Sequence, residues 1–343
     1  MLKHIRRGIL KFEEQIYEKK TIDYSLLAKD FSIFIDTSSL MRPQAQDLVG
    51  VSVSEIEMRK IPQLTVNWHL LEACNYNCYF CYAKYAQKSN FSSDYEKVLR
   101  ELSGLTETPL TFKGQNVVTA ESIRINFAGG EPFLAKDLSK AISLAYDLGL
   151  QPSFISNGSL ISTEFIKKYG HMISVAGFSI DSLDQETNAV IGRQTNRSAQ
   201  MTLERMKTIF SLFREYAPQT VLKINTVVCS ENFDADLSPM LEELRPDRWK
   251  ALQVIPIHGA TDRGITDEQY KKFLARHSGL IEKTVREDND HMHRSYLMLD
   301  PKACFYQRNG SLYLRSKSIV DVGAKSALQN VEFDVETYST RYS

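Results

Sequence analysis

The chain has 343 residues, of which 43% are hydrophobic and 24% are charged, so it can bury the core of one large domain or two small ones. Lys and Arg number 42, as do Asp and Glu, and this balance argues against a nucleic-acid partner. No apolar run approaches the length of a transmembrane segment, and no signal peptide is evident at the N-terminus. Five cysteines, an odd number, do not suggest a disulfide framework, so we expect a cytoplasmic protein.

Residues 1–62 are expected to form an N-terminal extension. Apolar residues recur at helical spacing over 2–16, and we expect this helix to pack on the rest of the protein. A helix lying on a membrane surface is the alternative. A short buried strand is expected at 33–36.

Residues 63–265 alternate between short runs rich in β-branched residues and segments of helical period. This pattern predicts an α/β fold, and six such units predict a partial (βα)6 barrel. Functional residues should then lie at the carboxyl ends of the strands. The expected strands are 64–70, 122–127, 153–155, 175–180, 221–228 and 251–257, and the expected helices are 94–103, 138–148, 163–169, 199–216 and 237–244.

Residues 266–343 are expected to form a C-terminal α/β extension that closes the substrate pocket. The pattern there begins with a helix and continues with a strand at 296–299. A hairpin should turn at Asn309-Gly310, because this dipeptide favours a tight reversal.

Three cysteines follow the first expected strand: Cys74, Cys78 and Cys81 are separated by three and then two residues. Three thiolates on one loop can bind three irons of a four-iron cluster and leave the fourth iron open to a small molecule. The spacing, flanked by aromatic residues, resembles that of radical AdoMet (radical SAM) enzymes, and this resemblance implies that the partial barrel is of the radical SAM type. The alternative is a structural zinc with Cys229 or Cys304 as fourth ligand, although neither belongs to a second cysteine pair.

The motif FAGGEP, residues 127–132, ends the second expected strand. A glycine pair lets the backbone approach a ligand and leaves peptide groups free for hydrogen bonds. In radical AdoMet enzymes a motif of this kind receives the methionine amino group of the cofactor. Small polar residues at the ends of the third and fourth strands suit ribose hydroxyls and a carboxylate, although they could also cap loops. The residues expected to bind AdoMet are Gly129, Gly130, Glu131, Ser156 and Ser179, whereas Asp181 is expected to be structural.

A third group of residues is cationic or amide-bearing and should converge, because alternate residues of a strand share one face. Lys223 lies in an otherwise apolar strand, where an unpaired lysine is costly to bury. A bound triphosphate would remove that cost through charge-assisted hydrogen bonds of about 1.5–3 kcal/mol each. The alternative for each residue is a snorkelling or salt-bridged side chain. The group comprises Arg124, Lys223, Asn225, Arg248 and Lys250, with Arg193 from the loop after the fourth strand.

Together these motifs resemble those of the viperin-like radical AdoMet enzymes over residues 63–327. Besides the cysteine and glycine motifs they are SNGSLI (156–161), DSxDxxxNxxIGR (181–193), KIN (223–225), RWK (248–250) and KSIxDVG (317–323). The resemblance implies a [4Fe-4S] cluster on Cys74, Cys78 and Cys81, bound S-adenosyl-L-methionine (AdoMet), and an electron donor such as flavodoxin or ferredoxin. It also adds Asn67 to the residues that bind the nucleotide.

The implied reaction is the dehydration of a nucleoside triphosphate to its 3′-deoxy-3′,4′-didehydro analogue, an antiviral chain terminator. CTP is the expected substrate, with UTP and GTP as alternatives. Base preference stays open because Arg124 replaces a lysine of the animal enzymes, Ala128 replaces a serine, and the segment 299–305 differs. The rival interpretations are a radical AdoMet enzyme acting on a peptide and a non-enzymatic, zinc-bound partner protein.

Overall fold

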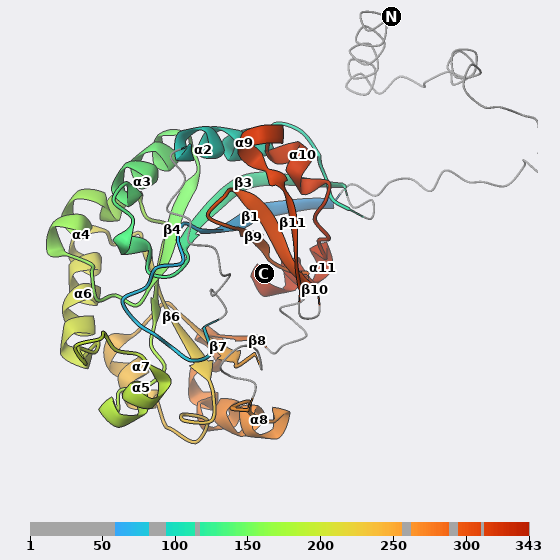
Figure 1. The fold of residues 1–343 in the computed structure, drawn as a ribbon. Coiled ribbons are helices and arrows are strands. Elements are labelled where there is room, and N and C mark those ends of the chain that lie inside the picture. The colour runs from blue at the N-terminus through green and yellow to red at the C-terminus, as the bar shows by residue number, and fades with distance from the viewer. Residues whose placement is uncertain are drawn as a thin grey trace, which may run out of the picture. The chain divides into compact units, whose positions relative to one another are not determined.

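One sheet of eleven strands organises the protein (Figure 1). The computed structural model describes residues 59–81, 94–113, 117–255, 262–287, 294–309 and 312–342, all within the unit Ile56–Ser343. The helix expected at 2–16 and the strand expected at 33–36 lie outside these residues. The strand order is β11-β10-β9-β1-β3-β4-β5-β6-β7-β8, and β2 (Leu110–Thr111) pairs with β3.

The parallel strands confirm the predicted α/β class and the partial barrel. They are β1 (Arg59–His69), β3 (Val117–Ala128), β4 (Gln151–Ser156), β5 (Val175–Ser179), β6 (Val221–Val228), β7 (Arg248–Gln253) and β8 (Thr284–Glu287). The six expected strands are β1 and β3 to β7, and β8 adds one more beside β7. The range predicted for β7, 251–257, is wrong, because this strand already pairs with β6 at Arg248.

Helices cover one face of the curved sheet, and Figure 1 shows α2, α3, α4 and α6 following its outer side. Helix starts are set by capping side chains: the Ser162 hydroxyl accepts from the Phe165 N–H, and the Thr202 hydroxyl accepts from the Arg205 N–H. The helices are α2 (Tyr95–Ser103), α3 (Leu138–Asp147), α4 (Thr163–Tyr169), α5 (Gln185–Ile191), α6 (Leu203–Tyr216), α7 (Ser238–Leu244) and α8 (Asp267–Arg276). Short 3-10 helices lie at Gly104–Thr106, Pro132–Leu134, Gly170–Met172 and Ser278–Lys283.

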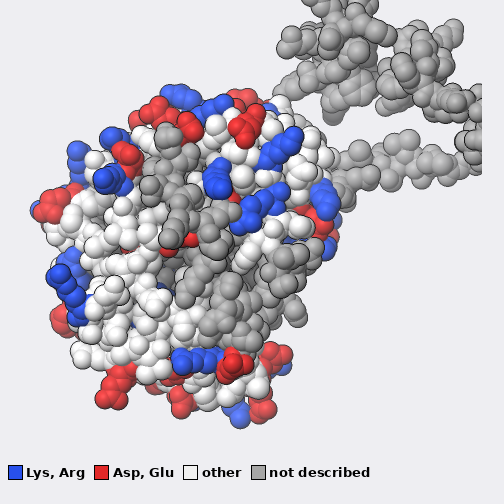
Figure 2. Space-filling model, viewed as in Figure 1, with Lys and Arg blue, Asp and Glu red and all other residues white. Residues whose placement is uncertain are grey.

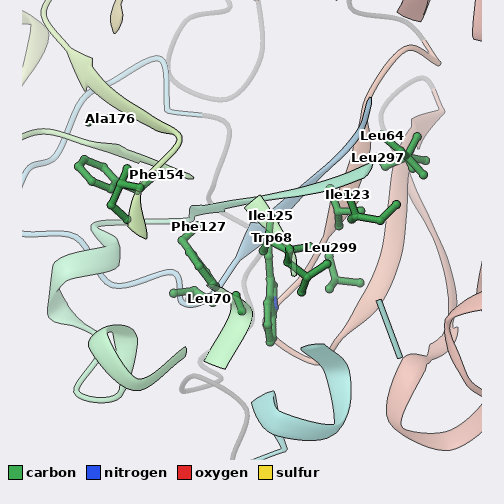
Figure 3. Close-up of a cluster of buried hydrophobic side chains, with 14 of the residues drawn as sticks. Leu64, Trp68, Leu70, Ile123, Ile125, Phe127, Phe154, Ala176, Leu297 and Leu299 are labelled. Carbon is green, nitrogen blue, oxygen red and sulfur yellow. The ribbon is translucent and has the colours of Figure 1, made fainter. Parts of the chain in front are cut away.

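The hydrophobic core lies between these helices and the sheet (Figure 3). Backbone pairing sets Trp68 of β1 beside Phe127 of β3, and Phe127 beside Phe154 of β4. All three side chains are fully buried. Side chains alternate along each strand, and this apolar set packs against the helices. The neighbouring residues of each strand therefore point to the opposite face of the sheet.

The C-terminal segment joins the same sheet. Strand β9 (Leu297–Leu299) pairs in parallel with β1, and β10 (Cys304–Asn309) pairs antiparallel with both β9 and β11 (Leu312–Ser318). The predicted hairpin is therefore confirmed by its strands, although Gly310 of its turn lies outside the described residues. Helices α9 (Ile319–Val322), α10 (Ala324–Leu328) and α11 (Val335–Tyr342) follow. No helix in the described ranges is both long and apolar enough to cross a membrane.

Candidate active site

The sheet face opposite the helices carries polar residues in rows. Asn67 of β1 pairs with Asn126 of β3, which pairs with Ser153 of β4. Further rows run through Gly177, Lys223 and Arg248, and through Ser179, Asn225 and Lys250. Six of the predicted nucleotide-site residues thus share this face, called the inner face from here on: Asn67, Arg124, Lys223, Asn225, Arg248 and Lys250.

Strand β6 shows how the two faces differ. Leu222 and Ile224 are buried against the helices, whereas Lys223 and Asn225 on the inner face are half-buried. The Oδ1 atom of Asn225 is nevertheless inaccessible to solvent and has no hydrogen-bond partner among the described residues. A buried oxygen left without a donor costs about 1–3 kcal/mol, and a ligand N–H or O–H group that reached this oxygen would remove that cost.

Lys250 joins two distant parts of the chain across the inner face. Its ammonium group donates to the hydroxyl of Tyr296, the residue before β9, at 2.6 Å. The lysine Nζ also lies 5.2 Å from the centroid of the Tyr296 ring. Sequence reasoning missed Tyr296, whose only signal was its place at the start of the expected strand 296–299.

Asn67 is held by neighbours on the inner face. Its Oδ1 accepts from Asn126 Nδ2 at 2.9 Å, and its Nδ2 donates to the Leu297 carbonyl at 3.4 Å. Ser153 donates in turn to Asn126 Oδ1 at 3.2 Å. Asn126 and Ser153 therefore orient Asn67, a role that the sequence indicated only through strand alternation.

The backbone on both sides of Cys78 is held by the end of α5. The Asn77 N–H donates to the Gly192 carbonyl at 3.1 Å, and the Tyr79 N–H donates to the Ile191 carbonyl at 3.0 Å. Cys81 is positioned separately: its N–H donates to the Cys78 carbonyl at 3.2 Å. Its side chain packs beside Tyr306 of β10.

Burial opposes ionisation of these thiols. It raises the pKa of Cys74 and raises the pKa of Cys78 to about 12, while the charge of Arg193 acts in the opposite direction on both. Because bound iron takes thiolates, cluster assembly would displace the protons. Within the described ranges no three His, Cys, Asp or Glu side chains converge on a point where one metal ion would sit. A four-iron cluster instead takes each thiolate at a different iron, and three thiols on one anchored loop beside a cation suit that donor set.

The glycine motif packs against the cysteine loop. The Gly130 N–H donates to the Leu71 carbonyl at 2.7 Å, and the Glu131 N–H donates to the Ala73 carbonyl at 2.8 Å. A Cβ atom on Gly130 would lie 2.0 Å from the Ala73 oxygen. The expectation that these peptide N–H groups stay free for a ligand is therefore wrong for Gly130 and Glu131. Because Gly130 has no side chain, the cysteine loop can approach its backbone closely.

The Glu131 carboxylate is buried and accepts three hydrogen bonds. The donors are the Ser156 hydroxyl at 2.7 Å, the Asn157 N–H at 2.9 Å and the Phe133 N–H at 3.2 Å. Burial raises the pKa of Glu131, and these hydrogen bonds oppose the rise. Since Ser156 gives its single hydrogen to Glu131, it can meet AdoMet only as an acceptor. Ser179, at the end of β5, is half-buried.

Arg193 follows α5 and forms a buried ion pair beside the cysteine loop. Its guanidinium forms an ion pair with the buried Asp181, whose other oxygen accepts from the Val227 N–H at 2.8 Å. Burial lowers the pKa of Arg193, but the carboxylate outweighs it and the net shift is upward. The guanidinium also lies 5.7 Å from the Phe80 ring centroid. The geometry thus places Arg193 beside the cysteine loop, and its expected role in the triphosphate site stays a prediction.

Comparisons with known proteins show a family match, related sequences and a shared fold. Residues 68–244 match the radical SAM superfamily. The S-adenosylmethionine-dependent nucleotide dehydratase of Psychrobacter lutiphocae is 34% identical over 82% of this chain and 95% of its own length. The S-adenosylmethionine-dependent nucleotide dehydratase RSAD2 of Danio rerio is 33% identical over 81% of this chain and 76% of its own. Native anSMEcpe with bound AdoMet shares the fold, with a TM-score of 0.57, 16% identity and 82% of each chain covered.

Proposed function

The chain belongs to the radical SAM superfamily and to its S-adenosylmethionine-dependent nucleotide dehydratases, and from this we propose that it dehydrates a nucleoside triphosphate. CTP is the proposed substrate, with UTP and GTP as alternatives. The proposed product is the 3′-deoxy-3′,4′-didehydro analogue, a chain terminator. Family membership makes the chain an enzyme that uses a [4Fe-4S] cluster and AdoMet, which sets aside the zinc-bound, non-enzymatic alternative.

The inner face is the observation that supports a nucleotide substrate. Arg124, Lys223, Arg248 and Lys250 bring four cationic side chains to one side of the sheet. Charge-assisted hydrogen bonds from such groups would hold a triphosphate. The buried Oδ1 of Asn225 offers an acceptor for a hydroxyl or amino group of the same ligand. We therefore assign the phosphates to the four cations and the nucleoside to the neighbourhood of Asn225 and Asn67.

The cofactors are assigned to the other half of the site. Cys74, Cys78 and Cys81 are the proposed cluster ligands, and Gly129, Gly130, Glu131, Ser156 and Ser179 the proposed AdoMet residues. When bound, the cluster and AdoMet supply a carbon radical that can remove a hydrogen atom from the substrate. Arg193, which lies beside the cysteine loop with its guanidinium paired to Asp181, stays among the residues proposed to bind the nucleotide. A cytoplasmic flavodoxin or ferredoxin is the proposed electron donor.

The first prediction concerns the cluster ligands. Cys78→Ala should abolish AdoMet cleavage, because two remaining thiolates on the loop would not hold the cluster. The measurement is an anaerobic reaction with AdoMet, dithionite and each of CTP, UTP, GTP and ATP, scored by mass for 5′-deoxyadenosine and a dehydrated nucleotide. Formation of 5′-deoxyadenosine by this variant at the unaltered rate would refute the ligand assignment, and absence of a dehydrated nucleotide from the unaltered chain would refute the reaction.

The second prediction concerns the phosphate cations. Lys223→Met should raise KM for the nucleotide roughly 10- to 150-fold, since one charge-assisted hydrogen bond contributes about 1.5–3 kcal/mol. Iron content should stay unchanged, because Lys223 is not on the cysteine loop. Lys272→Met is the matched control: this exposed lysine of α8 pairs with Glu268 on the outer surface. Equal KM values in the two variants would remove Lys223 from the site.

A further inference from the structure

Asn157, the residue after β4, directs its side-chain amide at the cysteine loop. Its Nδ2 donates to Asn75 Oδ1 at 2.9 Å and lies 4.0 Å from Cys74 Sγ. Its Oδ1 accepts from the Ser159 N–H at 2.9 Å and from the Ser159 hydroxyl at 2.6 Å. The residue is 5% exposed. Both hydrogens of the amide thus face the loop that carries the cysteines.

The orientation of this amide follows from its neighbours. A backbone N–H can only donate, so the Ser159 N–H requires the oxygen of Asn157 on its side. The nitrogen must then face Asn75 and Cys74. Asn75 closes the arrangement, since its Nδ2 donates to the Ser159 hydroxyl at 2.8 Å. Three side chains therefore fix one another, and Asn157 cannot turn without breaking several hydrogen bonds.

The proposed function leaves this side chain without a role. Asn157 contacts Glu131 through its backbone N–H, which any residue could supply. Cys78 is held through the end of α5 and Cys81 lies beside Tyr306, so neither depends on Asn157. Cys74, by contrast, has two N–H groups directed at its sulfur, from Asn157 and from the Tyr76 backbone at 3.4 Å. Only the first can be removed by substitution.

We propose that Asn157 is a positioning residue that donates an N–H···S hydrogen bond to Cys74 and raises the reduction potential of the cluster. The inference rests on the proposed assignment of Cys74 as an iron ligand. A reduced cluster carries one more negative charge, and a donor dipole beside a ligand sulfur stabilises that charge. Hydrogen bonds to the sulfurs are among the properties that set the potential of such clusters.

Two substitutions separate the donor from the rest of the side chain. Asn157→Leu keeps the approximate size and removes all polar atoms. Asn157→Asp keeps an acceptor for Ser159 and replaces the donor by a charged oxygen. The measurement is the midpoint potential of the reconstituted cluster without AdoMet, from an anaerobic titration followed by electron paramagnetic resonance, with iron and sulfide counted on the same samples.

The reduction potential should be highest in the unaltered chain, lower in Asn157→Leu and lowest in Asn157→Asp. Loss of the donor should lower the equilibrium constant for reduction about fivefold to tenfold, and tenfold corresponds to about 59 mV for a one-electron couple. The negative charge of Asn157→Asp should lower this equilibrium constant further. Asn188→Leu is the matched control, because this asparagine is also 5% exposed and its amide donates to the Ser182 carbonyl at 3.1 Å. Its potential should equal that of the unaltered chain.

Unchanged potentials in loaded Asn157 variants would overturn the inference, as would equal shifts in the Asn188 control. If Asn157→Leu loses its cluster, Asn157→Asp decides, since it keeps the contact to Ser159. Loss of the cluster from both, with Asn188→Leu loaded, would support the positioning role directly. Failure of the proposed function looks different: the unaltered chain would then form no dehydrated nucleotide, or Cys74→Ala would hold a full cluster and cleave AdoMet at the normal rate.

Discussion

At the scale of single residues, Gly192 determines where Cys78 can lie. This residue ends α5 with φ of +88°, a left-handed conformation that favours glycine. Its carbonyl accepts the Asn77 N–H. A Cβ atom at this position would lie 2.3 Å from the Asn77 oxygen. Both the conformation and the close approach therefore require glycine beside the cysteine loop.

Gly192→Ala should accordingly cost the protein its cluster as well as some stability. Gly149→Ala separates the two effects, because Gly149 has φ of +75° and a Cβ there would meet nothing within 4 Å. The control should lose about 1–2 kcal/mol of unfolding free energy from the left-handed conformation and keep its iron. Gly192→Ala should lose most of its iron. Iron and sulfide counts with urea unfolding test this, and a fully loaded Gly192→Ala would contradict it.

Candidate site residues could be located from the sequence where spacing alone marks them. Cys74, Cys78 and Cys81 are defined by their separation on one loop. Arg193 was different: it follows a short helix, and its direction depends on an ion pair with Asp181, twelve positions earlier in the chain. No periodicity reports such a contact. The glycines of the FAGGEP motif were identified as positions where the backbone could approach a ligand. In the structure, the segment that leads into the cysteine loop occupies the space where their side chains would lie.

At the scale of elements, strand alternation was the most reliable signal. The range 221–228 predicted β6 to the residue, because apolar residues at every second position alternate with Lys223 and Asn225. The next strand was placed too late, since its apolar run begins after the Arg248-Trp249-Lys250 triplet while its pairing with β6 begins at Arg248. Helix α5 (Gln185–Ile191) was missed because its apolar residues are the three consecutive ones at its end, 189–191, which show no helical period.

Strands β1 and β10 meet through a buried histidine. Tyr306 Oη lies 3.1 Å from His69 Nδ1, and the two rings pack edge to face at 5.9 Å. Burial lowers the pKa of His69 to about 3. The folded chain therefore binds fewer protons than the unfolded chain between pH 6.5 and 3. The stability that this neutral histidine contributes is complete above pH 6.5 and is lost as the pH falls through that window.

His69→Gln should reduce the amount of unfolding free energy that the protein loses as the pH falls below 6.5. Between pH 7 and pH 5 the unaltered chain should lose about 2 kcal/mol through this group, at about 1.4 kcal/mol per pH unit below 6.5. Urea unfolding under argon at the two pH values measures the difference. His171→Gln, at an exposed position, should keep the slope of the unaltered chain. Identical slopes in both variants would mean that His69 is not held neutral by the fold.

At the scale of the whole molecule, the last fifty residues complete the sheet that the cysteine loop follows. Strand β9 pairs with β1 although more than 200 residues separate them. Sequence pattern predicted the hairpin from Asn309-Gly310, but it could not place β9 beside β1, because pairing over such a distance leaves no local signal. The same holds for the contact between Lys250 and Tyr296. Charges of both signs are interspersed over the face shown in Figure 2.

Helix α11 extends this long-range closure to the part of β1 that precedes its pairing with β9. The buried Tyr338 hydroxyl donates to the Gln63 carbonyl at 2.8 Å and accepts from the Thr65 N–H at 2.8 Å. It thereby satisfies two backbone groups of β1 just before the residues that pair with β9. The C-terminal helix thus takes the place of a neighbouring strand for part of β1.

Tyr338→Phe should lower the unfolding free energy by about 1–3 kcal/mol, because the Thr65 N–H would stay buried without an acceptor. Tyr216→Phe is the control, since that side chain is 39% exposed on α6 and its loss should change stability by less than about 0.5 kcal/mol. Urea unfolding of both variants gives the comparison. Because β1 leads directly into the cysteine loop, destabilising β1 in Tyr338→Phe should also increase the rate at which the cluster is lost to a dilute chelator. Equal midpoints and equal rates in the two variants would show that α11 packs against β1 without supporting it.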